Sequence, residues 1–249
     1  MVGDNGGAKA ASRATAVKVE GLTKSFGTRL TLKGIDLEIK QGESVVIFGP
    51  NGAGKTTLLK VLATIMNPSS GKVFIDGLDA KSSPEEVRRR IGIVSHNTFL
   101  YGNLTAYENL DFYARLYDVP GRQERIHEIV SMVGMTPRLH HRVATLSRGM
   151  QQRLSIARSL LHKPSIMLLD EPETGLDRQA NAMLWEIFQT EGEQKRTMIL
   201  TTHNMERGLE LARRVLILDK GKIVYDGLKQ SLSLPALEKV YQTSTGTEI

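Results

Sequence analysis

The nine residues GPNGAGKTT, numbers 49–57, decide how this chain folds. They carry the spacing G-x4-G-K-T of a phosphate-binding loop, or P-loop. The apolar run at 44–48 before them is typical of a strand, and 58–62 after them has the apolar spacing of a helix. A strand, a glycine-rich turn and a helix N-terminus direct backbone N–H groups and the positive end of the helix dipole at one point. The sequence therefore predicts a site for the phosphates of a nucleotide.

Each part of the P-loop has an expected role. The glycines let the backbone approach the phosphate oxygens, because a Cβ would obstruct that approach. Lys55 is expected to reach the β and γ phosphates, and the Thr56 hydroxyl to occupy one position around Mg²⁺. The residues expected to bind the nucleotide are Gly49, Pro50, Asn51, Gly52, Ala53, Gly54, Lys55, Thr56 and Thr57.

The composition excludes several kinds of site. The chain has 249 residues, of which 40% are hydrophobic and 24% charged, the usual balance of a globular protein. It contains no cysteine, which excludes disulfides, thiolate catalysis and cysteine-bound metal centres. No apolar run approaches the roughly 18 residues that a membrane helix needs. Residues 1–16 lack the apolar core of a secretory signal, and we interpret them as a disordered tail.

The net charge of +6 permits contact with nucleic acid, anionic lipid or nucleotide phosphates. The longest basic run is Arg88-Arg89-Arg90, and no aromatic residues alternate with it. Such a run is more typical of a solvated helix face than of a surface that binds nucleic acid.

The rest of the chain alternates strands with helices. Apolar runs typical of buried strands occur at 91–94, 166–170 and 197–201. Between the first two, from about 97 to 163, the spacing is helical and predicts an inserted helical subdomain. Strands that alternate with helices imply a mainly parallel sheet with helices on both faces. Ligands of such sheets bind beyond the carboxyl ends of the strands.

Three side chains with chemical capacity follow predicted strands at that edge. Asp170 ends a buried strand and suits a second Mg²⁺ anchor. Glu171 could orient or deprotonate the attacking water, and His203 could contact the γ-phosphate. The alternatives are a carboxylate pair that caps a neighbouring helix and a histidine that is an ordinary polar residue. Phe26, in an earlier turn, is either a minor core residue or an aromatic platform for a purine ring.

With these residues in place, the stretch 17–227 resembles the ATP-binding subunits of ABC transporters. The segment LSRGMQQR at 146–153 is similar to the signature that opens a helix in the family's helical subdomain. The resemblance implies an α/β P-loop NTPase fold of the RecA-like type. This fold combines a mixed, mainly parallel sheet core with an antiparallel β subdomain and an inserted helical subdomain.

Further motifs of the family match at their expected places. Asp170 and Glu171 match its Walker B pair, and 174–177 resembles its D-loop. His203 matches the switch histidine, and Phe26 falls where the family places its adenine-stacking aromatic residue. The resemblance therefore favours the purine platform over the core residue.

The signature implies a dimer. In the family, its serine and glycine contact the γ-phosphate held by the other subunit. The resemblance therefore implies a head-to-tail homodimer, or a heterodimer with a second ABC ATPase, with ATP and Mg²⁺ at two composite sites. Ser147, Gly149 and Gln151 would act in trans.

Several positions depart from the family pattern. Arg148 replaces the second glycine of the signature, and Met150 replaces its glutamine. The Q-loop glutamine, which contacts the Mg²⁺ site, is replaced by His96, so His96 is expected to be a catalytic and metal contact. Its charge would vary near neutral pH. Glu173 replaces a small polar residue just before the D-loop.

The runs 95–117 and 146–164 look most like the ATPases of haem exporters that serve cytochrome c maturation. We therefore expect an ATPase subunit that drives a separate export permease and lies peripherally on the cytoplasmic face of the cell membrane. The permease would dock near His96 to Tyr107, unless the aromatic residues there only pack between subdomains. Drug or polysaccharide exporters are alternatives, as is a soluble ABC ATPase acting on nucleic acid or ribosomes. The single cassette without cysteine argues against nucleic acid as a partner, and the signature argues against a phosphotransferase kinase.

The expected domain organisation has three parts. A tail covers 1–16, the ATP-binding domain covers 17–231, and a C-terminal tail covers 232–249.

Overall fold

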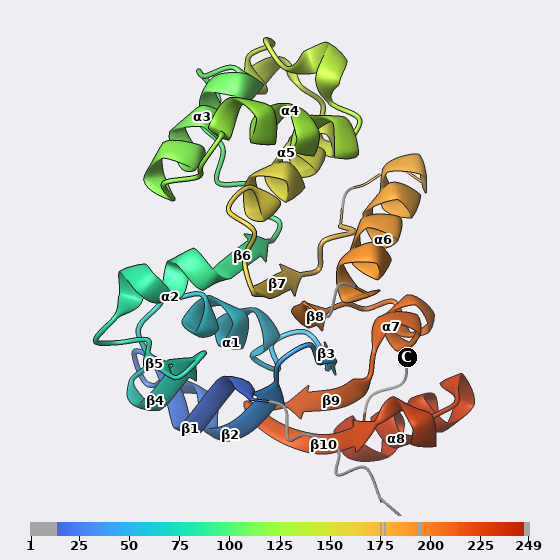
Figure 1. Ribbon diagram of the computed structural model, residues 1–249. Coiled ribbons are helices and arrows are strands. Elements are labelled where there is room, and N and C mark those ends of the chain that lie inside the picture. Colours follow the sequence, from blue (N-terminus) through green and yellow to red (C-terminus); the bar gives the residue numbers. More distant parts are fainter. Residues whose placement is uncertain (1–13, 175, 177, 194–195, 247–249) are drawn as a thin grey trace, which may run out of the picture.

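The computed structural model describes residues 14–174, 176, 178–193 and 196–246 of the chain. Two β-sheets with helix α1 (Lys55–Leu62) between them form the lower part of the view in Figure 1. A group of helices, α3, α4 and α5, stands above them in the same view. The arrangement is an α/β P-loop NTPase fold with an inserted helical unit, as the sequence predicted.

The larger sheet has six strands in the order β10-β9-β3-β8-β7-β6. Neighbours from β9 to β6 run parallel, and β10 pairs antiparallel with β9. Every residue of β3, β7 and β8 is buried, because helices cover both faces of the sheet. The strands are β3 (Ser44–Phe48), β6 (Ile91–Val94), β7 (Ile166–Asp170), β8 (Thr197–Thr201), β9 (Arg214–Asp219) and β10 (Lys222–Leu228).

The smaller sheet is antiparallel, with its four strands in the order β2-β1-β4-β5. Its two long strands pair from Thr15 opposite Lys40 to Phe26 opposite Arg29, so the turn between them brings Phe26 and Arg29 together. Gly27 makes this turn with a φ of 56°, in the left-handed region that glycine enters at little cost. The strands are β1 (Thr15–Phe26), β2 (Arg29–Lys40), β4 (Ser70–Ile75) and β5 (Leu78–Asp79).

The helices divide between the sheets and the inserted unit. Thr105 begins α3 with a capping box, in which its hydroxyl accepts from the Glu108 N–H and the Glu108 carboxylate accepts from the Thr105 N–H. The insert contains α3 (Ala106–Leu116), α4 (Arg122–Met132), the short 3₁₀ turns η1 (Thr136–Arg138) and η2 (Val143–Thr145), and α5 (Arg148–Leu160). The other helical elements are α2 (Pro84–Arg90), α6 (Arg178–Glu193), α7 (Met205–Leu211), η3 (Lys229–Ser231) and α8 (Leu234–Thr245).

Two hydrophobic cores lie on opposite faces of the larger sheet. Strand β3 contributes Val45 and Ile47 to the core that contains α1 and the smaller sheet. The same strand contributes Val46 and Phe48 to the core that contains α5 to α8 and the inserted helices. This alternation follows from the twofold period of a strand. It fixes β3 rigidly on both sides, directly before the P-loop.

Both chain ends differ in detail from the expected tails. Strand β1 begins at Thr15, two residues inside the predicted N-terminal tail, and residues 1–13 lie outside the described part. Within the predicted C-terminal tail, α8 packs on the fold because Leu237 and Tyr241, four residues apart, bury one helix face. The division of the chain into domains remains a prediction.

Candidate functional site

The P-loop joins the end of β3 to the start of α1 at the carboxyl edge of the larger sheet. Gly49 has a φ of 154°, and a Cβ placed on it would lie 2.1 Å from the Leu218 carbonyl oxygen. Gly54 has a φ of 111°, and its Cβ would lie 2.8 Å from the Leu32 side chain. Glycine is therefore required at 49 by the close backbone contact with β9 and favoured at 54 by its positive φ, quite apart from any ligand.

Lys55 is buried and held inside the loop. Its Nζ donates hydrogen bonds to the carbonyl oxygens of Gly49 at 2.6 Å and Pro50 at 3.3 Å. Burial lowers the pKa of Lys55, while the nearby carboxylates of Glu171 and Asp170 raise it. A cation held on two carbonyl oxygens can move onto phosphate oxygens, which are stronger acceptors.

A cavity of about 360 Å³ opens over this loop. The structure brings Phe26 and Glu171 to it together with the P-loop residues, as the sequence predicted for a nucleotide site. Its lining residues are Phe26, Arg29, Thr31, Pro50, Asn51, Gly52, Ala53, Gly54, Lys55, Thr56, Thr57 and Glu171. The Phe26 ring is 48% exposed at the mouth, with the Lys24 ammonium 5.4 Å from the ring centre. It is therefore available for stacking on a flat base and is not a core residue.

Asp170 and Thr56 lie together at the end of β7. The Thr56 hydroxyl donates to the Asp170 Oδ1 at 3.0 Å, and the Thr201 hydroxyl donates to the same oxygen at 2.8 Å. Asp170 is only 4% exposed, so these bonds compensate part of the cost of burying its charge. A hydroxyl and a carboxylate oxygen this close fit the oxygen ligands that Mg²⁺ prefers.

Glu171 turns away from the line of its strand. Its φ of 47° lies in the left-handed region, which is uncommon for a residue with a side chain. Its N–H contacts the Thr201 carbonyl oxygen at 3.0 Å and the Thr201 hydroxyl at 3.2 Å. Consecutive strand residues point to opposite sides, and this bend allows Asp170 and Glu171 to serve one site. The Glu171 Oε1 lies 2.7 Å from the His203 Nε2, which brings the two predicted hydrolytic side chains into contact.

The segment 146–153 lies in the inserted helical unit, away from this cavity (Figure 1). The Ser147 hydroxyl caps α5 by accepting from the Met150 N–H at 3.3 Å. The Gln151 side-chain amide donates to the carbonyl oxygens of Val143 at 3.2 Å and Leu146 at 3.0 Å, which holds the turn before α5 in place. Ser147, Gly149 and Gln151 are not among the residues that line the cavity of their own chain.

His96 follows β6 and is exposed. It makes no hydrogen bond or ion pair with another described residue and does not line the cavity, so its predicted contact with the metal stays a prediction. The buried side-chain amide of Gln152 donates to the carbonyl oxygens of Ser95, the residue before His96, at 3.5 Å and of Pro172 at 3.2 Å. Helix α5 therefore touches the residues beside both His96 and Glu171. In the predicted D-loop, Gly175 and Asp177 lie outside the described residues.

The family model of the ABC transporter ATP-binding domain matches residues 32–174. The chain belongs to the ABC transporter family. It is 38% identical over 205 residues to the ABC transporter ATP-binding protein NatA of Bacillus subtilis (strain 168), covering 81% of this chain and 83% of NatA. It is 34% identical over 231 residues to the daunorubicin resistance ATP-binding protein DrrA2 of Streptomyces coeruleorubidus, covering 90% of this chain and 72% of DrrA2.

Among solved structures, the fold matches the dimeric ATP-binding cassette MJ0796, in a post-hydrolysis state bound to ADP and Pi. The TM-score is 0.78 at 29% identity, over 87% of this chain and 100% of that one. Family and fold together identify this ABC cassette as an ATP-binding protein and an ATPase.

Sequence reasoning missed several residues of the cassette's site. Arg29 and Thr31 line the cavity because the Phe26 turn carries them back to the P-loop. Thr201 supports both carboxylate residues from the neighbouring strand. A polar residue at the end of a buried strand is a signal that could have revealed Thr201. No comparable signal existed for Arg29, because its place depends on how the two sheets pack.

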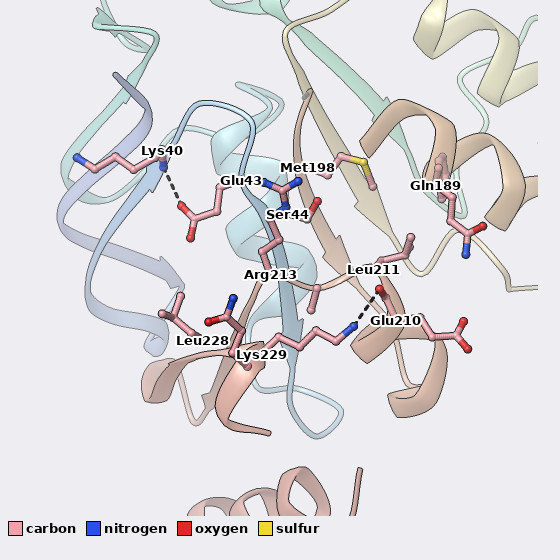
Figure 2. Close-up of a pocket in the computed structure, with 13 residues that line it drawn as sticks. Lys40, Glu43, Ser44, Gln189, Met198, Glu210, Leu211, Arg213, Leu228 and Lys229 are labelled. Carbon is pink, nitrogen blue, oxygen red and sulfur yellow. Dashed lines mark hydrogen bonds between the residues drawn. The ribbon is translucent and has the colours of Figure 1, made fainter. Parts of the chain in front are cut away.

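A larger hollow, of about 860 Å³, lies at the opposite edge of the sheet of this ABC cassette, where β3 begins and α6 and α7 end (Figure 2). Two hydrogen bonds join groups of residues that line it. The Lys40 N–H donates to Glu43 at 2.9 Å, and the Lys229 Nζ donates to the Glu210 carbonyl oxygen at 3.3 Å. Size alone would therefore place the ATP site of this cassette wrongly.

Proposed function

We propose that this chain is the ATP-binding and hydrolysing subunit of an ABC export transporter. In this proposal, two copies close on ATP and drive a separate membrane permease. The observation that carries it is the separation, within one chain, of the P-loop cavity from the helix headed by Ser147. The P-loop, Phe26 and Glu171 line one cavity, whereas the helix headed by Ser147 lies outside it. A second copy can supply that helix N-terminus, where backbone N–H groups favour an anion. The dimeric state of the similar cassette MJ0796 supports this arrangement.

The site residues divide the chemistry between them. Thr56 and Asp170 would hold Mg²⁺, which supplies positive charge to the β and γ phosphates when bound. Lys55 and the loop N–H groups bind the same phosphates, and Phe26 stacks on the base. Glu171 orients the attacking water and accepts its proton as the water oxygen bonds to the γ-phosphorus. The bond from that phosphorus to the bridging oxygen breaks, so ADP and phosphate leave.

His203 has a supporting role in this mechanism. It lies 2.7 Å from the Glu171 carboxylate and can hold that group against the γ-phosphate side of the cavity. Ser147 and Gly149 of the second copy would then close the site over the γ-phosphate. Gln151 supports this closure through the turn before α5, since its amide already holds two carbonyl oxygens there.

The permease would dock on the loop after β6 and the adjoining face of α3. Phe99, Tyr101, Phe112 and Leu116 are 38%, 51%, 42% and 55% exposed there. Tyr101 and Phe112 meet edge to face, with ring centres 5.3 Å apart, so the exposed aromatic groups form one surface. Large exposed apolar groups that gather in this way mark protein interaction sites. Tyr107, in contrast, is half-buried beside the ring of His140, 5.9 Å away, and is a packing residue.

Export is favoured by the similarity to DrrA2, whose name refers to daunorubicin resistance. A peripheral position on the cytoplasmic face of the membrane follows from this proposal. Among the described residues, no helix combines the length and apolar character needed to cross a bilayer. The one observation that bears on the identity of the cargo is the resemblance of residues 95–117 and 146–164 to haem-exporter ATPases. Haem export for cytochrome c maturation is therefore our second, finer candidate.

The basic run does not favour a nucleic-acid partner. Arg88 donates to the Thr64 hydroxyl at 2.9 Å, Arg89 pairs with Asp118 at 2.8 Å, and Arg90 pairs with Asp76 at 3.4 Å. All three side chains of the run thus contact groups of their own chain. This leaves the charge of the α2 surface partly neutralised.

Affinity purification of the tagged chain from native membranes tests the proposal. We expect an integral membrane protein to co-purify, and Phe112→Asp to reduce its recovery, because a charge would enter the aromatic surface. Val224→Asp, at an equally exposed apolar residue on β10, is the matched control and should leave the recovery unchanged. A haem absorption spectrum in the purified complex would support the haem cargo. Retention on ribosomes or DNA, without a membrane protein, would contradict the export proposal.

A further inference from the structure

Two turns that follow neighbouring strands hold the Glu171–His203 pair. The turn after β7 carries Glu171, and the turn after β8 carries His203. The first link between them is the Glu171 N–H, which donates to both the carbonyl and the hydroxyl oxygen of Thr201. A second link lies further out, where the Thr202 hydroxyl donates to the Glu173 Oε1. Thr202 is 1% exposed, and its hydroxyl also accepts from the Asn204 N–H at 2.9 Å. Two links therefore flank the catalytic pair: one joins the turn after β7 to the last residue of β8, and the other joins it to the turn after β8.

We propose that Glu173 is a positioning residue that keeps the Glu171 carboxylate in contact with His203 during ATP hydrolysis. The inference rests on the proposed roles of Glu171 and His203. Glu173 is not among the residues that line the P-loop cavity, and it acts through Thr202. Without the second link, the first alone would hold Glu171 in its left-handed conformation, which is strained by about 1–3 kcal/mol. Relaxation of that strain would move the carboxylate away from His203.

The chemical state of Glu173 suits this task. Burial is the main cause that raises its pKa, and the neighbouring Glu171 carboxylate raises it further. The bond from Thr202 and the nearby His203 oppose these two effects. The Oε1 of Glu173 can accept the hydrogen bond from Thr202 whether the carboxyl group is charged or neutral, so the link does not depend on its charge. Among the described residues, no group forms a hydrogen bond with the buried Glu173 Oε2, and such an atom in a native structure calls for an explanation.

The test compares ATP turnover and ATP affinity in full-length variants. Glu173→Ala should lower kcat roughly 10-fold or more, because a displaced carboxylate orients water poorly. ATP affinity should change less than about 2-fold, since the P-loop is untouched. Glu173→Gln should restore most of the turnover, because its neutral amide oxygen still accepts from Thr202. Thr202→Val should cause a loss similar to that of Glu173→Ala. The double variant should be no worse than either single one, because both remove the same bond.

Matched controls are available on neighbouring elements. Glu206 lies in the first turn of α7 and is exposed, so Glu206→Ala is one control. Thr190→Val is the other, and it removes a hydroxyl that donates to the Glu186 carbonyl oxygen on α6. Both should keep the normal kcat. Normal turnover of Glu173→Ala overturns the inference, as do losses that multiply in the double variant or no rescue by glutamine. A fall in ATP affinity or unfolding temperature that matches the fall in kcat also overturns it. If Glu171→Gln is inactive while Glu173→Ala is not, this inference fails alone. If Glu171→Gln is active, the proposed site roles fail first.

Discussion

At the scale of single residues, a backbone bend and hydrogen bonds between neighbouring strands bring the side chains of the site together. The P-loop letters predicted the phosphate site because each letter has a local reason, as the close contact of Gly49 with β9 shows. The left-handed bend at Glu171 had no such letter, since its two hydrogen bonds come from Thr201 on another strand. The link between Glu173 and Thr202 escaped prediction for the same reason. Both links depend on β7 and β8 being neighbours in the sheet, and local sequence does not determine the order of the strands.

Glu171→Gln tests the assigned water-orienting role. The amide has nearly the same shape but cannot accept a proton at neutral pH, so kcat should fall at least ~100-fold. ATP should still bind with an affinity within about 2-fold of normal, because the P-loop contacts remain. Uncleaved ATP should then trap a dimer, visible by size-exclusion chromatography with ATP and Mg²⁺. Glu206→Gln, on the exposed face of α7, is the control. Turnover at the normal rate in Glu171→Gln would show that another group activates the water.

His162 predicts a pH dependence of stability. Burial lowers its pKa from 6.5 to about 4, while its Nε2–H bond to the Ile91 carbonyl oxygen, 3.1 Å away, opposes the shift. The folded protein therefore keeps the ring neutral at pH values where the unfolded chain takes up a proton. This contribution to stability is present above pH 6.5 and is lost as the pH falls towards 4. At pH 5 the loss should reach about 2 kcal/mol.

The measurement for His162 is urea unfolding at pH 7.5 and pH 5. His162→Gln can keep the bond to Ile91 but does not titrate, so its stability should fall less between the two pH values. The difference between the proteins isolates this group, since other titrating groups are shared. His127→Gln, on the exposed side of α4, should behave like the unchanged protein. Equal acid losses in all three proteins would show that the burial of His162 carries no such penalty.

At the scale of elements, α5 was predicted as a helix, whereas its links to distant loops were not. Its apolar spacing reports only that one face is buried. The structure shows that its polar residues also hold it in place. Ser147 caps the helix, and the Arg158 guanidinium donates to a carbonyl oxygen of β6. Gln152 contacts the residues beside His96 and Glu171. Gln152 and Arg158 are polar residues on the buried face, where the sequence pattern predicts apolar ones. In this fold they connect the signature to the hydrolytic loop.

Arg158→Lys tests the connection between α5 and the loop after β6. The buried guanidinium donates to the Ile93 carbonyl oxygen at 2.7 Å and lies 5.4 Å and 5.2 Å from the ring centres of Phe99 and Tyr113. A planar cation stacks on both rings, whereas an ammonium is shorter and more strongly hydrated. The change should cost about 1–2 kcal/mol in urea unfolding. Arg115→Lys, a control at an exposed arginine that pairs with Asp111, should cost under about 0.5 kcal/mol. Equal costs would mean that the rings add nothing.

At the scale of the whole molecule, the sequence predicted the layers well and the edges poorly. Buried strands such as β7 are recognisable because all their residues are apolar up to Asp170. The length of β1 and β2, 12 residues each, was hidden by irregular register and by turn-forming glycines within them. Helix α8 was hidden by its short apolar face. Ser147 lies away from its own P-loop because the helical unit is inserted between β6 and β7. The sequence did predict this insertion.

The separation of Ser147 from its own P-loop leads to the prediction at this scale. A chain with Lys55→Ala and a chain with Ser147→Ala should each be inactive as homodimers, because every composite site then contains one defect. In a mixed dimer, both defects fall in one site, and the other site combines an intact P-loop with an intact signature. Mixing the two inactive proteins should therefore restore about a quarter of the normal ATPase rate, if pairing is random and the sites act independently. A mixture of Lys55→Ala with Lys55→Ala/Ser147→Ala is the control and should stay inactive. Absence of recovery in the first mixture, with mixed dimers confirmed by two affinity tags, would show that each chain works with its own Ser147.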